Sequence, residues 1–121
     1  MSWWLWFLSL AVLGMLWGAF AVTFLKNPGL ATFKKVVYKN LTAEKKRDYW
    51  CVECRIVMWQ GVEHCEDCNV CVEELDHHCP WTSKCIAKGN LVPFYIWLCS
   101  MFSTIIYMMV VALSLLPTID H

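Results

Sequence analysis

Ten side chains that commonly bind metal ions lie between residues 51 and 85. They are Cys51, Cys54, His64, Cys65, Cys68, Cys71, His77, His78, Cys79 and Cys85. A structural zinc site takes four such ligands in a tetrahedron, so two sites would use most of this set and leave one or two groups for other chemistry. The run from Asp76 to Cys79 holds a carboxylate, a base and a nucleophile, which is the composition of a reactive cysteine site.

Two short cysteine pairs give the strongest metal signal. Cys51 with Cys54 and Cys65 with Cys68 are Cys-x2-Cys units, and two such units this close together are typical of zinc sites. We find no other internal repeat in the sequence. The spacing alone leaves open which ligands complete each site, and the choices are His64, Cys71, His77, His78, Cys79 and Cys85.

Two uncharged segments flank the cluster. The chain is 59% hydrophobic, and neither Ser2–Leu25 nor Leu91–Ile119 contains a charged residue. Each is longer than the roughly 20 apolar residues that span a bilayer as a helix. We therefore predict transmembrane helices over 3–25 and 92–116. A signal peptide is the alternative for the first segment, but that segment lacks a basic start and is longer than the usual apolar run.

The expected fold is an integral membrane protein, mainly α, with two transmembrane helices flanking a small, irregular, double-zinc cysteine-rich domain over 51–90. Little regular structure is expected there, because metal rather than a hydrophobic core would hold so short a segment. Asn27-Pro28-Gly29 should end the first helix. Residues 26–50 form a basic juxtamembrane linker, either solvated or lying against anionic headgroups.

Basic residues predict the orientation of the central loop. All ten Lys and Arg residues lie from Lys26 to Lys88, so the loop should face the cytosol at an endomembrane. The mitochondrial matrix is the equivalent side if the chain is a subunit of an inner-membrane complex. Both compartments are reducing, which favours metal binding over disulfides. The glycosylation sequon at Asn40 would then stay unmodified.

The cluster as a whole resembles the cysteine-rich domain of the DHHC protein S-acyltransferases. An unbroken pattern runs from Cys51 to Cys85 and reads Cys-x2-Cys-x9-His-Cys-x2-Cys-x2-Cys-x4-Asp-His-His-Cys-x5-Cys. Pro80-Trp81 after the motif, Asn90 and Phe94 also fit, and Asn27-Pro28-Gly29 is similar to the family's Asp-Pro-Gly.

The resemblance implies a ligand set for each of two structural Zn²⁺ ions. One set is Cys51, Cys54, His64 and Cys71, and the other is Cys65, Cys68, His78 and Cys85. It also implies that Cys79 attacks a long-chain acyl-CoA, while His77 takes the thiol proton and Asp76 orients His77. The acyl group would then pass to cysteines of membrane-associated proteins. Trp81 would line the acyl or CoA site, or pack at the membrane interface.

Departures from the family pattern support a second hypothesis. The family has four membrane helices where this chain has two, and Glu74 replaces a basic residue that the family commonly has before its motif. Ser83-Lys84 replaces Asn-Asn, and Trp59-Gln60-Gly61 replaces Pro-x-Arg. The alternative is a catalytically weak or inactive, DHHC-derived zinc-binding subunit whose zinc module and helices scaffold a larger membrane complex. An active enzyme would instead borrow the missing helices from partner subunits. Nucleic acid is not an expected partner, because the loop's ten basic and nine acidic residues nearly balance.

Overall fold

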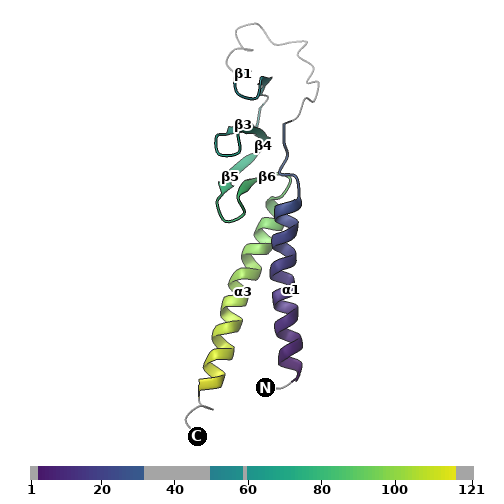
Figure 1. Ribbon diagram of the computed structural model, residues 1–121, viewed down its shortest axis with the longest axis vertical. Coiled ribbons are helices and arrows are strands. Elements are labelled where there is room, and N and C mark those ends of the chain that lie inside the picture. Colours follow the sequence, from purple (N-terminus) through teal and green to yellow (C-terminus); the bar gives the residue numbers. More distant parts are fainter. Residues whose placement is uncertain (1–2, 32–49, 59, 117–121) are drawn as a thin grey trace. The chain divides into compact units, whose positions relative to one another are not determined.

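The computed structural model describes residues 3–31, 50–58 and 60–116 (Figure 1). Most of the predicted basic linker, the sequon at Asn40 and Trp59 lie outside these ranges. The chain divides into two compact units. One unit contains the residues up to Thr23 together with those from Pro93 onward, and the other runs from Phe24 to Val92.

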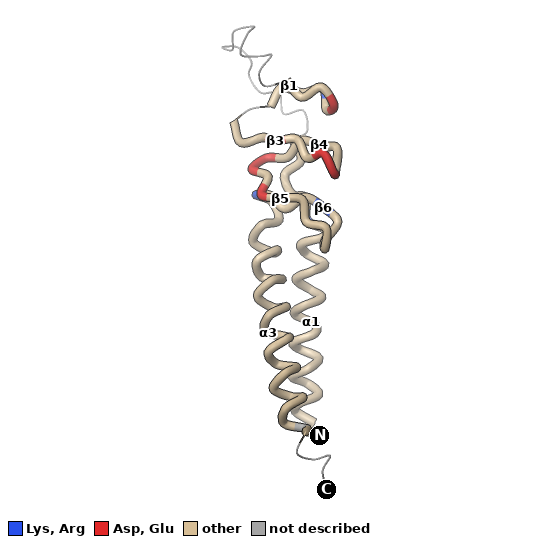
Figure 2. The backbone as a smooth tube through the Cα atoms, turned by 90° about the vertical axis from the view of Figure 1, so that its left-hand side faces the viewer, with Lys and Arg blue, Asp and Glu red and all other residues tan. Residues whose placement is uncertain are grey.

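The first unit is a pair of long apolar helices, α1 (Trp3–Leu25) and α3 (Leu91–Leu115). The hydroxyl groups of Ser9 and Tyr107 hydrogen-bond at 2.8 Å, and the rings of Phe20 and Trp97 lie 5.6 Å apart. The start of α1 thus contacts the end of α3, and the end of α1 contacts the start of α3, so the helices are antiparallel. Figure 2 shows no charged residue along either helix. The predicted pair of apolar helices flanking a cysteine-rich region is confirmed.

The second unit begins with the end of α1, where the sequence predicts a break. The Asn27 side-chain oxygen accepts hydrogen bonds from the backbone N–H groups of Gly29 and Leu30, at 2.9 and 3.0 Å. Gly29 has a φ of 114°, a conformation that favours glycine. This turn follows directly on the end of α1.

A lysine from far along the chain caps that helix end. The ammonium group of Lys84 donates to the carbonyl oxygens of Phe24 and Lys26, at 2.6 and 2.9 Å. The last carbonyls of a helix have no partner within the helix, and a cation there is favoured by the helix dipole. No basic residue occupies the last turn of α1 itself, so Lys84 supplies this cap.

The cysteine-rich region is more regular than the sequence predicts. Its described residues form three antiparallel two-stranded hairpins. Their strands are β1 (Trp50–Cys51), β2 (Ile56–Val57), β3 (Val62–Cys65), β4 (Val70–Glu73), β5 (Leu75–Cys79) and β6 (Lys84–Ala87). An isolated two-stranded hairpin is marginally stable at best, so the expectation of metal support still applies.

The hairpins also repeat, which corrects the expectation that only the Cys-x2-Cys units do. Strands β1, β3 and β5 end at Cys51, Cys65 and Cys79, a constant spacing of 14 residues. Strands β2, β4 and β6 begin at Ile56, Val70 and Lys84, with the same spacing. The third hairpin therefore has the same build as the two that carry cysteine pairs.

The segment after α1 lies along the three hairpins of the second unit, called the hairpin unit below. The N–H of Glu73 donates to the Gly29 carbonyl at 2.8 Å, and the N–H of Ala31 donates to the Cys71 carbonyl at 2.9 Å. The N–H of Gly89 donates to the Pro28 carbonyl at 2.8 Å. The segment is thus held between β4 and the residues that follow β6.

Candidate functional site

Two groups of four side chains gather in the hairpin unit. Within each group the ligand atoms all lie within 4.8 Å of one another. The first group is Cys51, Cys54, His64 and Cys71, and the second is Cys65, Cys68, His78 and Cys85. These are the two sets that the family resemblance implies, and the spacing of the residues alone did not separate them.

Strand pairing explains how each group forms. His64 on β3 lies opposite Cys71 on β4, and His78 on β5 lies opposite Cys85 on β6. Each cross-strand pair supplies half of a group. The other half is the Cys-x2-Cys unit in the turn of the preceding hairpin, so each site ties two hairpins together.

The distances suit a tetrahedral zinc ion. His64 Nδ1 lies 3.3, 3.4 and 3.7 Å from the sulfur atoms of Cys51, Cys54 and Cys71. His78 Nδ1 lies 3.7 and 3.2 Å from those of Cys65 and Cys68. Zinc bond lengths of about 2.3 Å to sulfur and about 2.1 Å to nitrogen give tetrahedral edges of roughly 3.6 Å. The donor set of three thiols and one imidazole is also one that structural zinc uses.

Burial disfavours the thiolate forms of Cys71 and Cys85. Burial raises the pKa of Cys71 above its ordinary value, and the neighbouring thiols of Cys51 and Cys54 raise it further. Burial and the thiols of Cys68 and Cys65 do the same for Cys85. A divalent cation would offset the cost of burying these thiolates by binding them.

Cys79 belongs to neither group. It is the last residue of β5 and only 2% exposed, with Thr82 and Trp81 following in the turn. Burial raises the pKa of Cys79, but several hydrogen bonds outweigh it and bring that pKa below its ordinary value. They come from the Thr82 hydroxyl, from the N–H groups of Thr82 and Trp81, and from His77.

His77 and Asp76 form a hydrogen bond beside Cys79. His77 Nδ1 lies 2.7 Å from an Asp76 carboxylate oxygen. A carboxylate only accepts, so Nδ1 carries the proton and Nε2 is left for the thiol. Burial lowers the pKa of His77, yet the hydrogen bonds and charges of Asp76 and Cys79 outweigh this and raise it. The three predicted catalytic residues therefore lie together and can share a proton.

The structural roles of three residues near this site are not predicted from the sequence. Thr82 is buried beside Cys79, and Lys84 caps α1. Asn90 is fully buried, and its side chain bonds the Ala87 N–H and the Cys85 carbonyl at 2.9 and 3.0 Å. The 14-residue spacing would have pointed to Thr82 as the counterpart of Cys54 and Cys68. The sequence holds no comparable signal for the Lys84 cap.

Comparisons with known proteins agree with the pattern of the site. The sequence model of the DHHC palmitoyltransferase family matches residues 44–120. The chain is 35% identical over 91 residues to the mouse (Mus musculus) protein "Palmitoyltransferase ZDHHC8". This match covers 74% of the chain and 12% of the mouse protein. The chain is 37% identical over 91 residues to zebrafish (Danio rerio) "Palmitoyltransferase ZDHHC5-B", with 74% and 14% covered. The chain thus spans about an eighth of the length of these relatives.

Proposed function

The chain belongs to the DHHC palmitoyltransferase family, and from this premise we propose that it is a protein S-acyltransferase whose nucleophile is Cys79. The observation that carries the proposal is the placement of Asp76, His77 and Cys79 together and outside both metal groups. A zinc-bound thiolate is a poor nucleophile, whereas a cysteine next to a base is activated.

The first step is the transfer of an acyl group to the enzyme. The Cys79 sulfur attacks the thioester carbonyl of a long-chain acyl-CoA, and His77 Nε2 takes the thiol proton. The tetrahedral adduct collapses, the bond to the CoA sulfur breaks, and CoA leaves as a thiol with the proton from His77. Asp76 holds the imidazole in the required tautomer and stabilises its charged form.

The second step returns the nucleophile. A cysteine thiol of a membrane-associated protein attacks the thioester on Cys79, and the proton again passes through His77 to the leaving group. The substrate gains the acyl chain and Cys79 becomes a thiol again. The near-complete burial of Cys79 would limit hydrolysis of the thioester, because water reaches it poorly.

Zinc in this proposal is structural. Bound at the two groups, it would fix the hairpins that present Cys79, without taking part in either step. The eight cysteine and histidine ligands are those gathered in the hairpin unit.

We also propose that both helices span a bilayer, with the cysteine-rich loop on the cytosolic side. Each helix is long and apolar enough to cross, and only 6% of each span is buried within the protein. A core helix of a soluble protein would be mostly buried, so this exposure supports lipid contact. The contacts between α1 and α3 favour a retained helix over a cleaved signal sequence.

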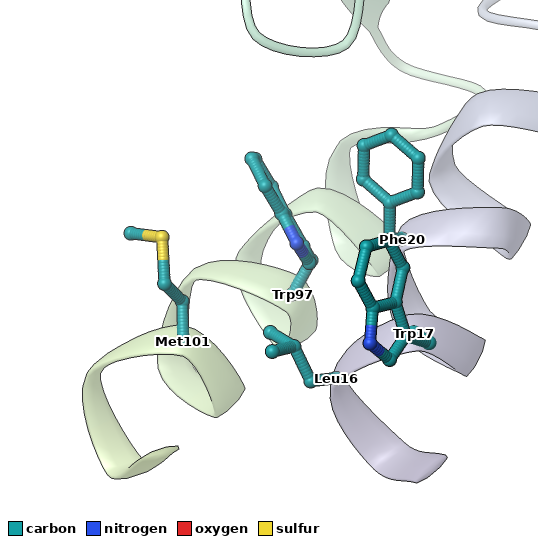
Figure 3. A pocket seen from close by; sticks show the side chains of 5 residues that line it. All are labelled: Leu16, Trp17, Phe20, Trp97 and Met101. Carbon is teal, nitrogen blue, oxygen red and sulfur yellow. The ribbon is translucent and has the colours of Figure 1, made fainter. Parts of the chain in front are cut away.

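An apolar cavity between the two helices would serve an acyl chain. It has a volume of about 300 Å³ and is lined by Leu16, Trp17, Phe20, Trp97 and Met101 (Figure 3). Its lining is aromatic and aliphatic, which suits hydrocarbon rather than a polar ligand. Two helices leave it partly open, so further helices would complete its wall.

Charge favours the alternative, a zinc-binding subunit without activity. The described residues of the hairpin region carry more acidic than basic side chains (Figure 2). The acidic ones are Glu53, Glu63, Glu66, Asp67, Glu73, Glu74 and Asp76, against Arg55, Lys84 and Lys88. Lys84 caps α1 and Lys88 pairs with Glu74. The phosphate groups of CoA would be repelled by such a surface.

The two functions are separated by trapping the acyl-enzyme. Protein isolated from its membrane, with any bound partners, is incubated with a palmitoyl-CoA analogue and tested for a hydroxylamine-sensitive label. We expect label on the native chain and none on Cys79→Ser, with both zinc ions retained in each. Cys99→Ser, which alters an exposed cysteine on α3, is the matched control and should label normally.

Either alternative outcome is decisive. Absence of label on zinc-loaded native protein would overturn the enzyme proposal and support the structural subunit. Label that persists in Cys79→Ser but disappears in Cys99→Ser would show that another cysteine accepts the chain.

A further inference from the structure

We infer that Cys79 occupies the first position of a third, metal-free knuckle turn, in which Thr82 stands where the other two turns carry their second cysteine. Thr82 is then a positioning residue for the Cys79 thiol. The turn itself is a structural claim, whereas the role of Thr82 in catalysis rests on the proposed function.

The three turns occupy equivalent places in their hairpins. Each begins with a cysteine that ends one strand and pairs across the hairpin with the residue that begins the next. These pairs are Cys51 with Ile56, Cys65 with Val70, and Cys79 with Lys84. The fourth position of the turns is Cys54, Cys68 and Thr82.

The backbone follows the same path in all three turns. The fifth residues, Arg55, Asn69 and Ser83, have φ angles of 54°, 54° and 51°. Non-glycine residues are uncommon in this left-handed region, so three of them at equivalent positions indicate one shared turn geometry. The first cysteine is also buried each time, with exposed fractions of 4%, 5% and 2%.

A backbone hydrogen bond reaches the first sulfur in the two turns that carry a cysteine pair. The N–H of Cys54 donates to Cys51 Sγ at 3.4 Å, and the N–H of Cys68 donates to Cys65 Sγ at 3.5 Å. In the third turn the N–H of Thr82 holds the same position, and it contributes to lowering the pKa of Cys79. In the first two turns this donor serves a sulfur that belongs to a metal group, and in the third it serves a sulfur outside both groups.

Thr82 adds contacts that a cysteine would not make. Its side chain is 1% exposed, and its hydroxyl lies 3.4 Å from the Cys79 carbonyl oxygen and also contacts the Cys79 sulfur. Threonine is not a usual zinc ligand, so the turn lacks the second thiolate that a knuckle needs. The donors around the sulfur therefore fix the direction in which a free thiol points, and such orientation is a large part of the rate of an attack.

The first experiment changes the hydroxyl alone. Thr82→Val keeps the side-chain shape, and Thr82→Ser keeps the hydroxyl. We expect Thr82→Val to slow acyl-enzyme formation about tenfold at saturating acyl-CoA with an unchanged KM, since orientation rather than binding is lost. Thr82→Ser should restore the rate to within about threefold. Thr104→Val, a buried threonine of α3, is the matched control and should leave the rate unchanged.

Zinc content is measured in each variant, so that loss of the fold is recognised. A zinc-loaded Thr82→Val variant that acylates at the native rate would overturn the role of Thr82. The same holds if Thr82→Ser is as slow as Thr82→Val, because then packing and not the hydroxyl matters.

The second experiment tests the turn without any activity. Thr82→Cys completes a third Cys-x2-Cys unit, with His77 next to it. Titrated with Cd²⁺ under reducing conditions, this variant should bind one more equivalent than the native chain, seen as added cadmium–thiolate absorbance. The double variant Thr82→Cys/Cys79→Ser should lose that extra equivalent. Equal binding by native chain and Thr82→Cys would overturn the knuckle assignment, even if the native chain forms no acyl-enzyme.

Discussion

At the scale of single residues, neighbours decide what each cysteine can do. Cys51 and Cys65 each face an imidazole and two further thiols, a set that suits a metal ion. Cys79 occupies an equivalent turn position but meets Thr82 and His77 instead. Cys99 lies exposed on α3. One residue type thus serves as ligand, as proposed nucleophile and as a side chain on an apolar helix, according to its contacts.

The proposed base makes a testable prediction at this scale. His77→Ala should slow acyl-enzyme formation by about 10²-fold or more, because the thiol loses its proton acceptor. Asp76→Asn should also slow it, since the carboxylate that holds Nδ1–H loses its charge. The rate is measured by single-turnover labelling, with zinc content checked because His78 is adjacent.

Glu63→Gln serves as the charge control. Glu63 is exposed on β3, and the substitution removes one negative charge from the same unit. Its rate should match that of the native chain. A zinc-loaded His77→Ala variant that labels at the native rate would mean that another group takes the proton.

At the scale of elements, the hairpins are joined by a tight backbone crossing in addition to the two groups of metal ligands. The segment that follows α1 passes so close to Gly89 that a side chain there has no room. A Cβ on Gly89 would lie 2.8 Å from the Pro28 carbonyl carbon and closer still to the Asn27 carbonyl oxygen. Backbone atoms cannot rotate away as a side chain can, so the segment itself would have to move.

Gly89→Ala should therefore destabilise the protein by about 1–3 kcal/mol, the usual cost of overpacking. Thermal unfolding of the zinc-loaded protein in detergent, followed by tryptophan fluorescence, would show a lower Tm. Gly14→Ala on α1 is the matched control, because a Cβ there meets nothing within 4 Å, and its Tm should not fall. Equal midpoints for the two variants would contradict the close crossing.

The elements also show how far the sequence predicts this structure. Both helices follow from long uncharged segments, and the Asn27-Pro28-Gly29 break follows from the chemistry of its residues. The hairpins do not, because strands of two to five residues are too short to show an alternating pattern. The grouping of the metal ligands came from a family pattern, since His64 pairs with Cys71 only through a hairpin that spacing does not reveal.

Contacts between distant residues were beyond prediction for a related reason. Lys84 lies 60 residues from Phe24 in the sequence, and nothing in either residue type indicates that one caps the other. Thr82 was overlooked because threonine is not a metal ligand. Its meaning appears only when the third hairpin is compared with the first two.

At the scale of the whole molecule, charge is segregated although the net charge is zero. Every Lys and Arg lies between the two apolar segments, together with nine of the ten acidic residues. The start of α1 is rich in tryptophan, and Trp3, Trp4 and Trp6 are all exposed. Indole rings at a helix end suit a membrane interface. Lipid on both helices and water around the hairpins would account for this distribution.

Orientation in the membrane is the last prediction. The basic residues should keep the loop on the cytosolic side, so Asn40 should escape glycosylation although Asn40-Leu41-Thr42 is a sequon. The chain is translated in the presence of microsomes and its mobility is compared before and after glycosidase treatment, and we expect no shift. A variant with a sequon on a C-terminal extension beyond His121 is the control and should shift, because that end would be luminal. Modification of Asn40 with an unmodified C-terminal sequon would invert the topology, place the cysteines in an oxidising compartment, and remove the basis for a zinc-bound, reduced site.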